Sequence, residues 1–194
     1  MDDSSFYISL PSLRDNHQME LDELHQDCSR RQKKGLHFIL ASVVIWGLIL
    51  AVHLTGLSIG TKNLITFCCS AVLFPLAWGL SKVLKIDFEG KGNPLTKAGI
   101  LFSVNQMLYI LIAMWVFAAV PEKMLMVYAM IFGAHLMPFS WLYQSRSYLV
   151  LSIVVPILSL VLGLVFPPFV LAAVMMLVEI LFSFLLYKEC NSLN

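Results

Sequence analysis

The chain has 194 residues, of which 59% are hydrophobic and only 13% are charged, and its formal net charge at pH 7 is +1. A typical soluble domain carries roughly 25% charged residues, so this chain has too little polar surface to cover a water-soluble fold. It also lacks a basic patch interleaved with exposed aromatic residues, which argues against nucleic-acid binding. The composition therefore indicates a single membrane domain.

Residues 1–34 come first and are predicted to form a polar cytoplasmic N-terminal arm that is partly helical. The arm carries seven acidic and five basic residues. A thin apolar stripe at helical spacing is formed by Leu10, Leu13, Leu21, Leu24 and Cys28. Such a stripe suits a helix that lies on the membrane or docks on a partner, but the acidic face would be repelled by anionic lipid and favours a solvated arm. We accordingly expect His17 and His25 to be solvated.

Six apolar stretches follow the arm, and each has about the 20 residues that an α-helix needs to cross a hydrocarbon core of roughly 30 Å. They are residues 36–58, 63–83, 98–120, 124–143, 148–166 and 168–187. The links after the first, third and fifth stretches are short, so the helices should form three antiparallel hairpins. We predict an all-α membrane protein with six transmembrane helices in residues 35–188 and a cytoplasmic tail at 189–194.

The Lys and Arg residues are distributed unevenly between the two sides of this arrangement. If the N-terminus is cytoplasmic, the outer segments hold only Lys62 and Lys123, and the other eleven basic residues lie inside. Cytoplasmic segments carry such an excess of Lys and Arg, and the excess orients the spans. We therefore predict that both termini are cytoplasmic. The eleven inner residues are Arg14, Arg30, Arg31, Lys33, Lys34, Lys82, Lys85, Lys91, Lys97, Arg146 and Lys188.

A weak internal repeat links the second and fourth stretches. The pattern A-x-L-x-P-x-x-W occurs at residues 71–78 and again at residues 134–141. Small transporters often contain repeats, which favours a duplication of the first two hairpins. Trp is also common near the ends of spans in any membrane protein, and a shared constraint explains the pattern equally well.

Four polar residues lie at a similar depth inside three of the stretches. Counted from the cytoplasmic end at 1.5 Å per residue, Asn105, Gln106, His135 and Glu179 are all roughly 10–12 Å deep. Glu179 is the only carboxylate well inside a stretch, and an unpaired charge there costs about 2.5–3.5 kcal/mol on insertion scales. We expect it to be protonated or paired with a protonated His135. The layer is interpreted either as a proton-titrating or substrate-binding site, or as hydrogen bonding that holds helices together.

No catalytic or metal-binding constellation can be read from the sequence. No two His residues stand four apart with an acid, so a zinc site is not predicted. Ser140 and His135 are five apart on one helix and point in different directions, so the serine lacks an activating base. We therefore expect no enzyme activity, no metal and no cofactor.

Three segments of the sequence carry a resemblance to a known family. They are GILFSVNQMLYILIAMWVFAAVPEKMLMVYAMIFGAHLMPFSWLYQSRSY (residues 99–148), KKGLHFILASVVIW (33–46) and FCCSAVLFPLAWGLSKVLKIDF (67–88). Together they resemble a family of small bacterial six-span integral membrane proteins catalogued only as a domain of unknown function. The resemblance covers about residues 33–187. It implies a multi-pass protein of the bacterial cytoplasmic (inner) membrane, and it transfers no activity.

Two classes of function remain open. The first is a small permease or channel-like transporter of a small solute or proton that uses the polar layer and works as a homo-oligomer. The second is a non-transporting assembly or regulatory component that acts through its arm and the loop at residues 82–97. A cavity that reaches the polar layer favours the first, and a bundle packed solid there favours the second. In both cases the lipid bilayer is the main partner.

Overall fold

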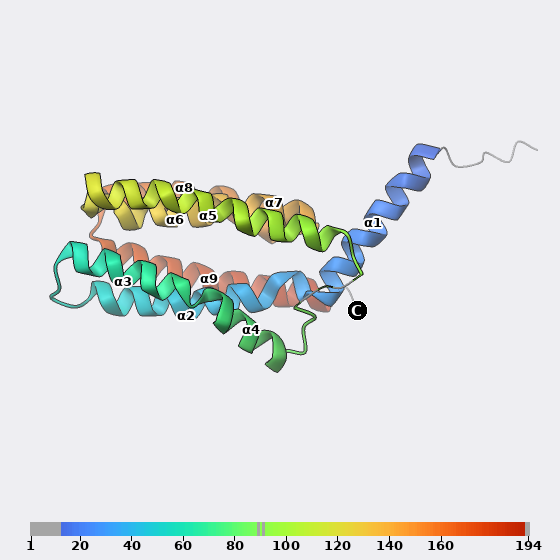
Figure 1. Ribbon diagram of the computed structural model, residues 1–194, viewed down its shortest axis with the longest axis horizontal. Helices are drawn as coiled ribbons and strands as arrows, with labels where there is room; N and C mark the ends of the chain where they lie inside the picture. Colours follow the sequence, from blue (N-terminus) through green and yellow to red (C-terminus); the bar gives the residue numbers. More distant parts are fainter. Residues whose placement is uncertain (1–12, 89, 91, 193–194) are drawn as a thin grey trace, which may run out of the picture.

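The computed structural model describes residues 13–88, 90 and 92–192, with side chains from residue 20 onward. These residues form helices and connecting turns without a strand, and Figure 1 shows the long helices side by side in two layers. The helices are α1 (Leu13–Arg31), α2 (Leu36–His53), α3 (Ile59–Ala71), α4 (Leu73–Val83), α5 (Leu95–Ala119), α6 (Met124–Ala134), α7 (Leu136–Leu142), α8 (Arg146–Val165) and α9 (Pro168–Asn191). Short 3-10 turns, η1 (Lys33–Gly35) and η2 (Pro121–Lys123), precede α2 and α6.

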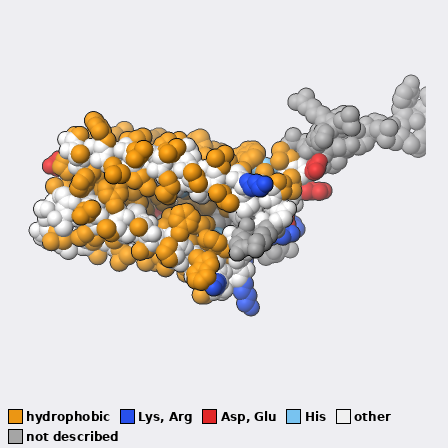
Figure 2. All heavy atoms as spheres, in the orientation of Figure 1, with side chains coloured by type: hydrophobic (Ala, Val, Ile, Leu, Met, Phe, Trp, Pro, Cys, Tyr) orange, Lys and Arg blue, Asp and Glu red, His pale blue; other side chains and the backbone are white. Residues whose placement is uncertain are grey.

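Six helical segments are long and apolar enough to cross a membrane. They are Lys33–His53, Ile59–Val83, Leu95–Ala119, Pro121–Leu142, Arg146–Val165 and Pro168–Asn191. They correspond one to one to the six predicted stretches, so the prediction of an all-α chain with six such helices is confirmed. Hydrophobic side chains cover the visible face of the bundle in Figure 2, as expected for a surface in contact with acyl chains.

The second and fourth of these segments are each interrupted by a kink. The break between α3 and α4 lies at Val72, and the break between α6 and α7 lies at His135. Pro75 and Pro138 each follow the break by three residues. A proline ring clashes with the carbonyl group four residues before it and removes one helical hydrogen bond, which bends the helix at this point. The internal repeat therefore marks two equivalent kinks.

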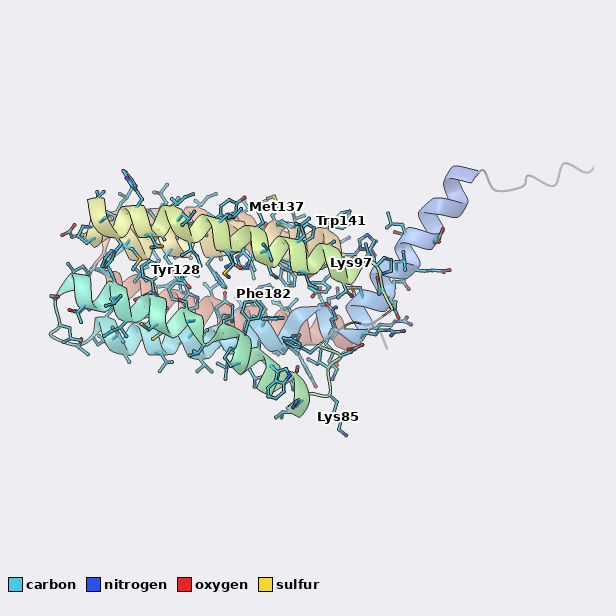
Figure 3. The ribbon with its side chains drawn as sticks, viewed as in Figure 1. Lys85, Lys97, Tyr128, Met137, Trp141 and Phe182 are labelled. Atoms are coloured by element: carbon cyan, nitrogen blue, oxygen red, sulfur yellow. The ribbon has the colours of Figure 1, made fainter. Side chains whose placement is uncertain are left out.

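The core lies where α2 packs along α9 and where α6 packs along α8. Trp46 and Phe182 are among the largest fully buried side chains, and Figure 3 shows Phe182 between the two layers. The backbone of α6 approaches side chains of α8 closely at Gly133, where an added Cβ would lie 2.6 Å from Pro156 Cδ. The pairing of α2 with α9 joins the first spanning helix to the last.

The second half of α1 packs against the turn between α7 and α8. His25 Nδ1 donates to the carbonyl oxygen of Leu142 at 2.9 Å, and Ser29 Oγ donates to that of Tyr143 at 3.0 Å. His25 is 2% exposed, so the expectation that it is solvated was wrong. It lies on the buried side of α1, where its ring satisfies a carbonyl group at the end of α7. The side chain of His17 lies outside the described residues.

The same end of the bundle is held together by Glu189, near the end of α9. Its carboxylate accepts hydrogen bonds from Lys34 Nζ at 2.8 Å, Ser145 Oγ at 2.7 Å and Ser147 Oγ at 2.6 Å. Lys34 is 5% exposed, and a buried ammonium group needs such a counter-ion. Glu189 therefore links the ends of the first, fifth and sixth spans.

Candidate functional site

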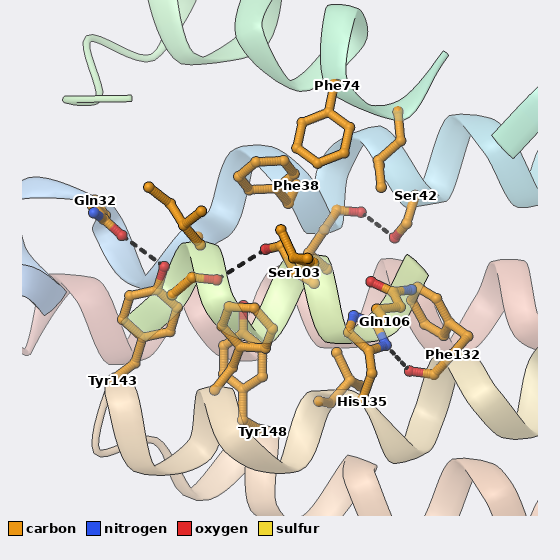
Figure 4. A pocket seen from close by; sticks show the side chains of 18 of the residues that line it. Gln32, Phe38, Ser42, Phe74, Ser103, Gln106, Phe132, His135, Tyr143 and Tyr148 are labelled. Atoms are coloured by element: carbon orange, nitrogen blue, oxygen red, sulfur yellow. Dashed lines mark hydrogen bonds between the residues drawn. The ribbon is translucent and has the colours of Figure 1, made fainter. Parts of the chain in front are cut away.

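A pocket with a volume of about 460 Å³ lies between the two kinked spans. Its walls come from α2, α4, α5, α6, α7 and α8, and Figure 4 shows it from close by. Leu73 and Phe74 follow the kink at Val72, and His135 and Leu136 lie at the other kink. Both proline kinks therefore border the pocket, because a bent helix diverges from its neighbours and leaves space beside the bend.

The pocket has a mainly apolar and aromatic lining. The aromatic side chains are Phe38, Phe74, Phe88, Phe132, Phe139, Tyr143 and Tyr148. The other polar side chains are Gln32, Ser42, Thr96, Ser103, Gln106 and His135. No Asp, Glu, Lys or Arg belongs to the described lining, and the described part of the chain holds no group of three His, Cys, Asp or Glu side chains that could bind a metal ion.

One end of the pocket is crossed by a series of hydrogen bonds. Tyr143 donates its hydroxyl proton to Gln32 Oε1 at 2.8 Å, and Thr96 Oγ1 donates to the carbonyl oxygen of Gly90 at 2.9 Å. Gln32 Nε2 lies 3.5 Å from Thr96 Oγ1. Burial raises the pKa of the Tyr143 phenol, so it remains a neutral donor. These polar groups are thus engaged with one another, and they connect the ends of α1 and α7 to the start of α5.

At the level of the kinks, His135 and Gln106 supply hydrogen-bonding groups to the pocket wall. His135 Nδ1 contacts the carbonyl oxygen of Phe132, and Figure 4 draws this bond. A carbonyl oxygen can only accept, so Nδ1 carries the proton, and Nε2 of the neutral ring is an acceptor. The amide of Gln106 adds both a donor and an acceptor.

Glu179 lies behind the pocket, fully buried between α9 and α2. Its Oε2 is 2.5 Å from Ser42 Oγ, and Ser42 also lines the pocket. Ser42 Oγ is in addition 2.7 Å from the carbonyl oxygen of Ile39. A hydroxyl group has one proton to donate, so a protonated Glu179 that donates to Ser42 Oγ satisfies both contacts. The hydrogen-bond partner of Glu179 is thus Ser42, whereas His135 bonds to Phe132.

Asn105 lies away from the pocket. Its side chain is exposed, and its Nδ2 donates to the hydroxyl group of Tyr109 on the same helix at 3.0 Å. Consecutive residues of an α-helix point about 100° apart, so a helix that turns Gln106 to the pocket turns Asn105 away from it. Of the four residues of the predicted layer, Gln106 and His135 line the pocket, Glu179 stands behind it, and Asn105 is outside.

Several polar lining residues were missed by the sequence reasoning. Ser103 lies three residues before Gln106, so helical spacing alone could have placed both on one face of α5. Gln32, Thr96 and Tyr143 stand outside or at the ends of the predicted stretches. These residues come together only because α1 and the loop before α5 pack against the bundle. No local sequence pattern indicates that contact.

Six long apolar helices, five of which supply the walls of the pocket, define a multi-pass α-helical membrane protein. Within that class, the chain belongs to the family of unknown function DUF7010, whose model matches residues 21–189. The match includes all the residues that line the pocket, and the resemblance to a family of unknown function is confirmed. No curated protein and no solved structure matches the chain.

Proposed function

We propose that this protein is a small permease-like membrane protein that binds a solute in the pocket between its two kinked spans. The observation that carries the proposal is the pocket itself, about 460 Å³ in volume and bordered by Gln106 and His135. This volume is within the range of small-molecule sites, which are mainly apolar with a few placed polar groups. Interrupted helices at the binding site are also a common construction of secondary transporters.

The proposal includes an orientation with both termini in the cytoplasm of a bacterial cell, in its inner membrane. Its support is the excess of Lys and Arg at the end of the bundle where α1 and the end of α9 meet. Figure 3 shows Lys85 and Lys97 at this end. The series of hydrogen bonds from Tyr143 to Thr96 would then separate the pocket from the cytoplasm.

A permease must open its pocket to water in part of its cycle, and a cysteine in the pocket can report this opening. We would introduce Ser103→Cys into a variant that lacks Cys28, Cys68, Cys69 and Cys190, the four free cysteines. A membrane-impermeant thiol reagent is then applied to right-side-out and to inverted vesicles. We expect labelling from at least one side, and faster labelling when Tyr143→Phe removes the hydrogen bond to Gln32. Ser159→Cys, fully buried outside the pocket, is the control.

Labelling of Ser103→Cys no faster than that of Ser159→Cys, in both kinds of vesicle, would contradict the proposed function. It would leave a pocket that never meets water, through which no solute could pass.

The exposed face of α5 supports a homo-oligomer as part of this proposal. α5 buries only Leu95, Ala113 and Val116 of its 25 residues. Asn105 stands on its exposed side in the middle of the span, where a polar side chain gains from a hydrogen bond to another helix. We expect Asn105→Leu to lower the oligomeric mass measured in mild detergent. An unchanged mass would remove this support.

The alternative, a non-transporting component that acts through its arm and loop, has less support. Both segments are engaged with each other and with the bundle, because Asn93 Nδ2 donates to the carbonyl oxygen of Leu24 at 2.8 Å and to Asp27 Oδ2 at 2.9 Å. The Asn93 hydrogen bond also lowers the pKa of Asp27, so this contact persists at neutral pH.

A further inference from the structure

The pocket opens sideways, between α4 and α5. Phe74 on α4 and Ile100, Val104 and Met107 on α5 line the pocket and are also 43–59% exposed on the outer surface. α4 packs on α2, whereas α5 packs on α6 and α7. The two helices that border the opening therefore pack on different neighbours. Figure 2 shows the surface hollowed between the two layers. Because the rim is made of exposed apolar residues of spanning helices, the opening faces acyl chains.

The lining restricts the charge of any ligand that enters there. The described lining holds no Asp, Glu, Lys or Arg, and the neutral imidazole of His135 carries no charge to pair with a phosphate, a carboxylate or an ammonium group. An ion taken from water into an apolar site without a partner is strongly disfavoured. Glu179 does not change this conclusion, because Ser42 stands between its carboxyl group and the pocket.

The polar groups of the pocket wall indicate which uncharged hydrogen-bonding groups the ligand carries. His135 Nε2 accepts a hydrogen bond, and the amide of Gln106 can accept one and donate one. A hydroxyl or an uncharged amide matches this pair, because each has both a donor and an acceptor. The remaining wall, with Phe38, Phe74 and Phe139, suits an apolar chain or ring.

Resting on the proposed function, we infer that the ligand is a neutral amphiphile that enters from the bilayer between α4 and α5. It has one uncharged hydroxyl or amide head group, held by His135 and Gln106, and an apolar body along the aromatic wall. The head group reaches the level of the kinks, and the body extends toward the opening beside Phe74 and Val104.

The experiment uses the full chain in proteoliposomes and a long-chain alcohol that carries a photoreactive diazirine. After irradiation, we expect cross-links in residues 99–107 and 132–139, the parts of α5, α6 and α7 that line the pocket. The unlabelled alcohol should compete with the probe. An alkyl sulfate of equal chain length keeps its negative charge and should not compete, and an alkane without a head group should compete weakly.

Variants of the wall test the two head-group contacts. Loss of a single hydrogen bond corresponds to about fivefold weaker binding, so His135→Phe and Gln106→Leu should each weaken competition by the alcohol about fivefold. Ser140→Ala is the control, because Ser140 lies on α7 outside the pocket lining and its hydroxyl only donates to the carbonyl oxygen of Met137. Its competition curve should equal that of the unmodified chain. Ser103→Leu, which adds side-chain volume to the pocket, should abolish the cross-links.

Three results would overturn the inference: competition by the alkyl sulfate as strong as that by the alcohol, cross-links spread evenly over the lipid-facing helices, or equal effects of Gln106→Leu and Ser140→Ala. If one of these occurs while Ser103→Cys still reacts from water, the ligand class is wrong and the proposed function stands. If Ser103→Cys is also unreactive, the proposed function itself fails.

Discussion

Glu179 is surrounded by atoms that tolerate a neutral carboxyl group but not a charge of either sign. It is 0% exposed, and among the described residues Ser42 is the only hydrogen-bond partner of its side chain, while Oε1 has none. A carboxylate in this place would have a single hydrogen bond to compensate for its lost hydration. We therefore expect the packing of α2 against α9 to require a protonated Glu179.

A pair of substitutions tests this dependence. Glu179→Gln keeps the shape and the neutral charge, and we expect the thermal unfolding temperature in detergent to change little. Glu179→Lys places an unpaired cation in the same buried position, and we expect it to destabilise the fold by about 3–5 kcal/mol. Equal unfolding temperatures for the two variants would show that the position is open to water.

Cys28 offers a second test at the residue scale. Burial, with a smaller contribution from Asp27, raises the pKa of its thiol from 9.0 to about 11. The thiolate is the reactive form, so in a variant that keeps only this cysteine we expect very slow maleimide labelling at pH 8 and fast labelling after denaturation. Ser192→Cys at an exposed position should react quickly.

The same shift makes stability depend on pH. The folded chain holds the thiol proton more tightly than the unfolded chain, so stability falls as the pH rises from about 9 through about 11. A Cys28→Ala variant should lose this part of the pH dependence in unfolding experiments. Fast labelling of Cys28 in the folded state would contradict its placement on the buried side of α1.

Counting residues at a constant rise predicts one level for Asn105, Gln106, His135 and Glu179, and the pocket brings Gln106 and His135 together. Such a count does not give the direction of a side chain around its helix. Direction depends on which face of a helix is buried, and the hydrophobic residues of α5 are spread over nearly all its sides, so they do not indicate whether Asn105 or Gln106 faces inward. Whether these residues act in transport stays a prediction.

At the scale of elements, two prolines shape the pocket. Pro75 and Pro138 stand at equivalent places in the internal repeat, and each bends its span three residues earlier. The signal was present in the sequence, because proline inside a helical pattern predicts a kink. What the pattern could not give was the position of the two kinks relative to each other, since this depends on how α4 and α7 pack on different neighbours.

The contact between α6 and α8 gives an element-scale prediction. An added Cβ at Gly133 would lie within 2.8 Å of Pro156 Cδ and of two side-chain atoms of Val155. We expect Gly133→Ala to destabilise the bundle by about 1–3 kcal/mol, because two helices must move apart. Gly79→Ala is the matched control, since nothing lies within 4 Å of its added Cβ. Thermal unfolding of both variants in one detergent measures the difference, and equal stabilities would contradict the close approach.

For the whole molecule, the charge distribution predicts an orientation that can be measured directly. We expect Glu122→Cys, exposed in the turn before α6, to react with an impermeant reagent on intact cells. Ser192→Cys, exposed at the end of α9, should react only after the cells are opened. The reverse result would invert the proposed orientation.

The number of spanning helices was predictable because apolar length is itself the signal. The choice of packing partners was not. Short links predict that neighbours in sequence lie side by side, but the link lengths say nothing of α2 and α9, which pack together over much of their length. Both helices are apolar on all sides, so hydrophobic periodicity does not reveal the face that each presents to the other.

This pairing of the first spanning helix with the last has a consequence for synthesis on the ribosome. α2 is synthesised well before its partner α9, which follows more than a hundred residues later and carries Glu179 and Glu189. Until α9 is present, Lys34 lacks its counter-ion Glu189, and Ser42 lacks its hydrogen-bond partner Glu179. The interface between α2 and α9 can close only after α9 has been synthesised, so the packing face of α2 stays uncovered while the intervening helices are made.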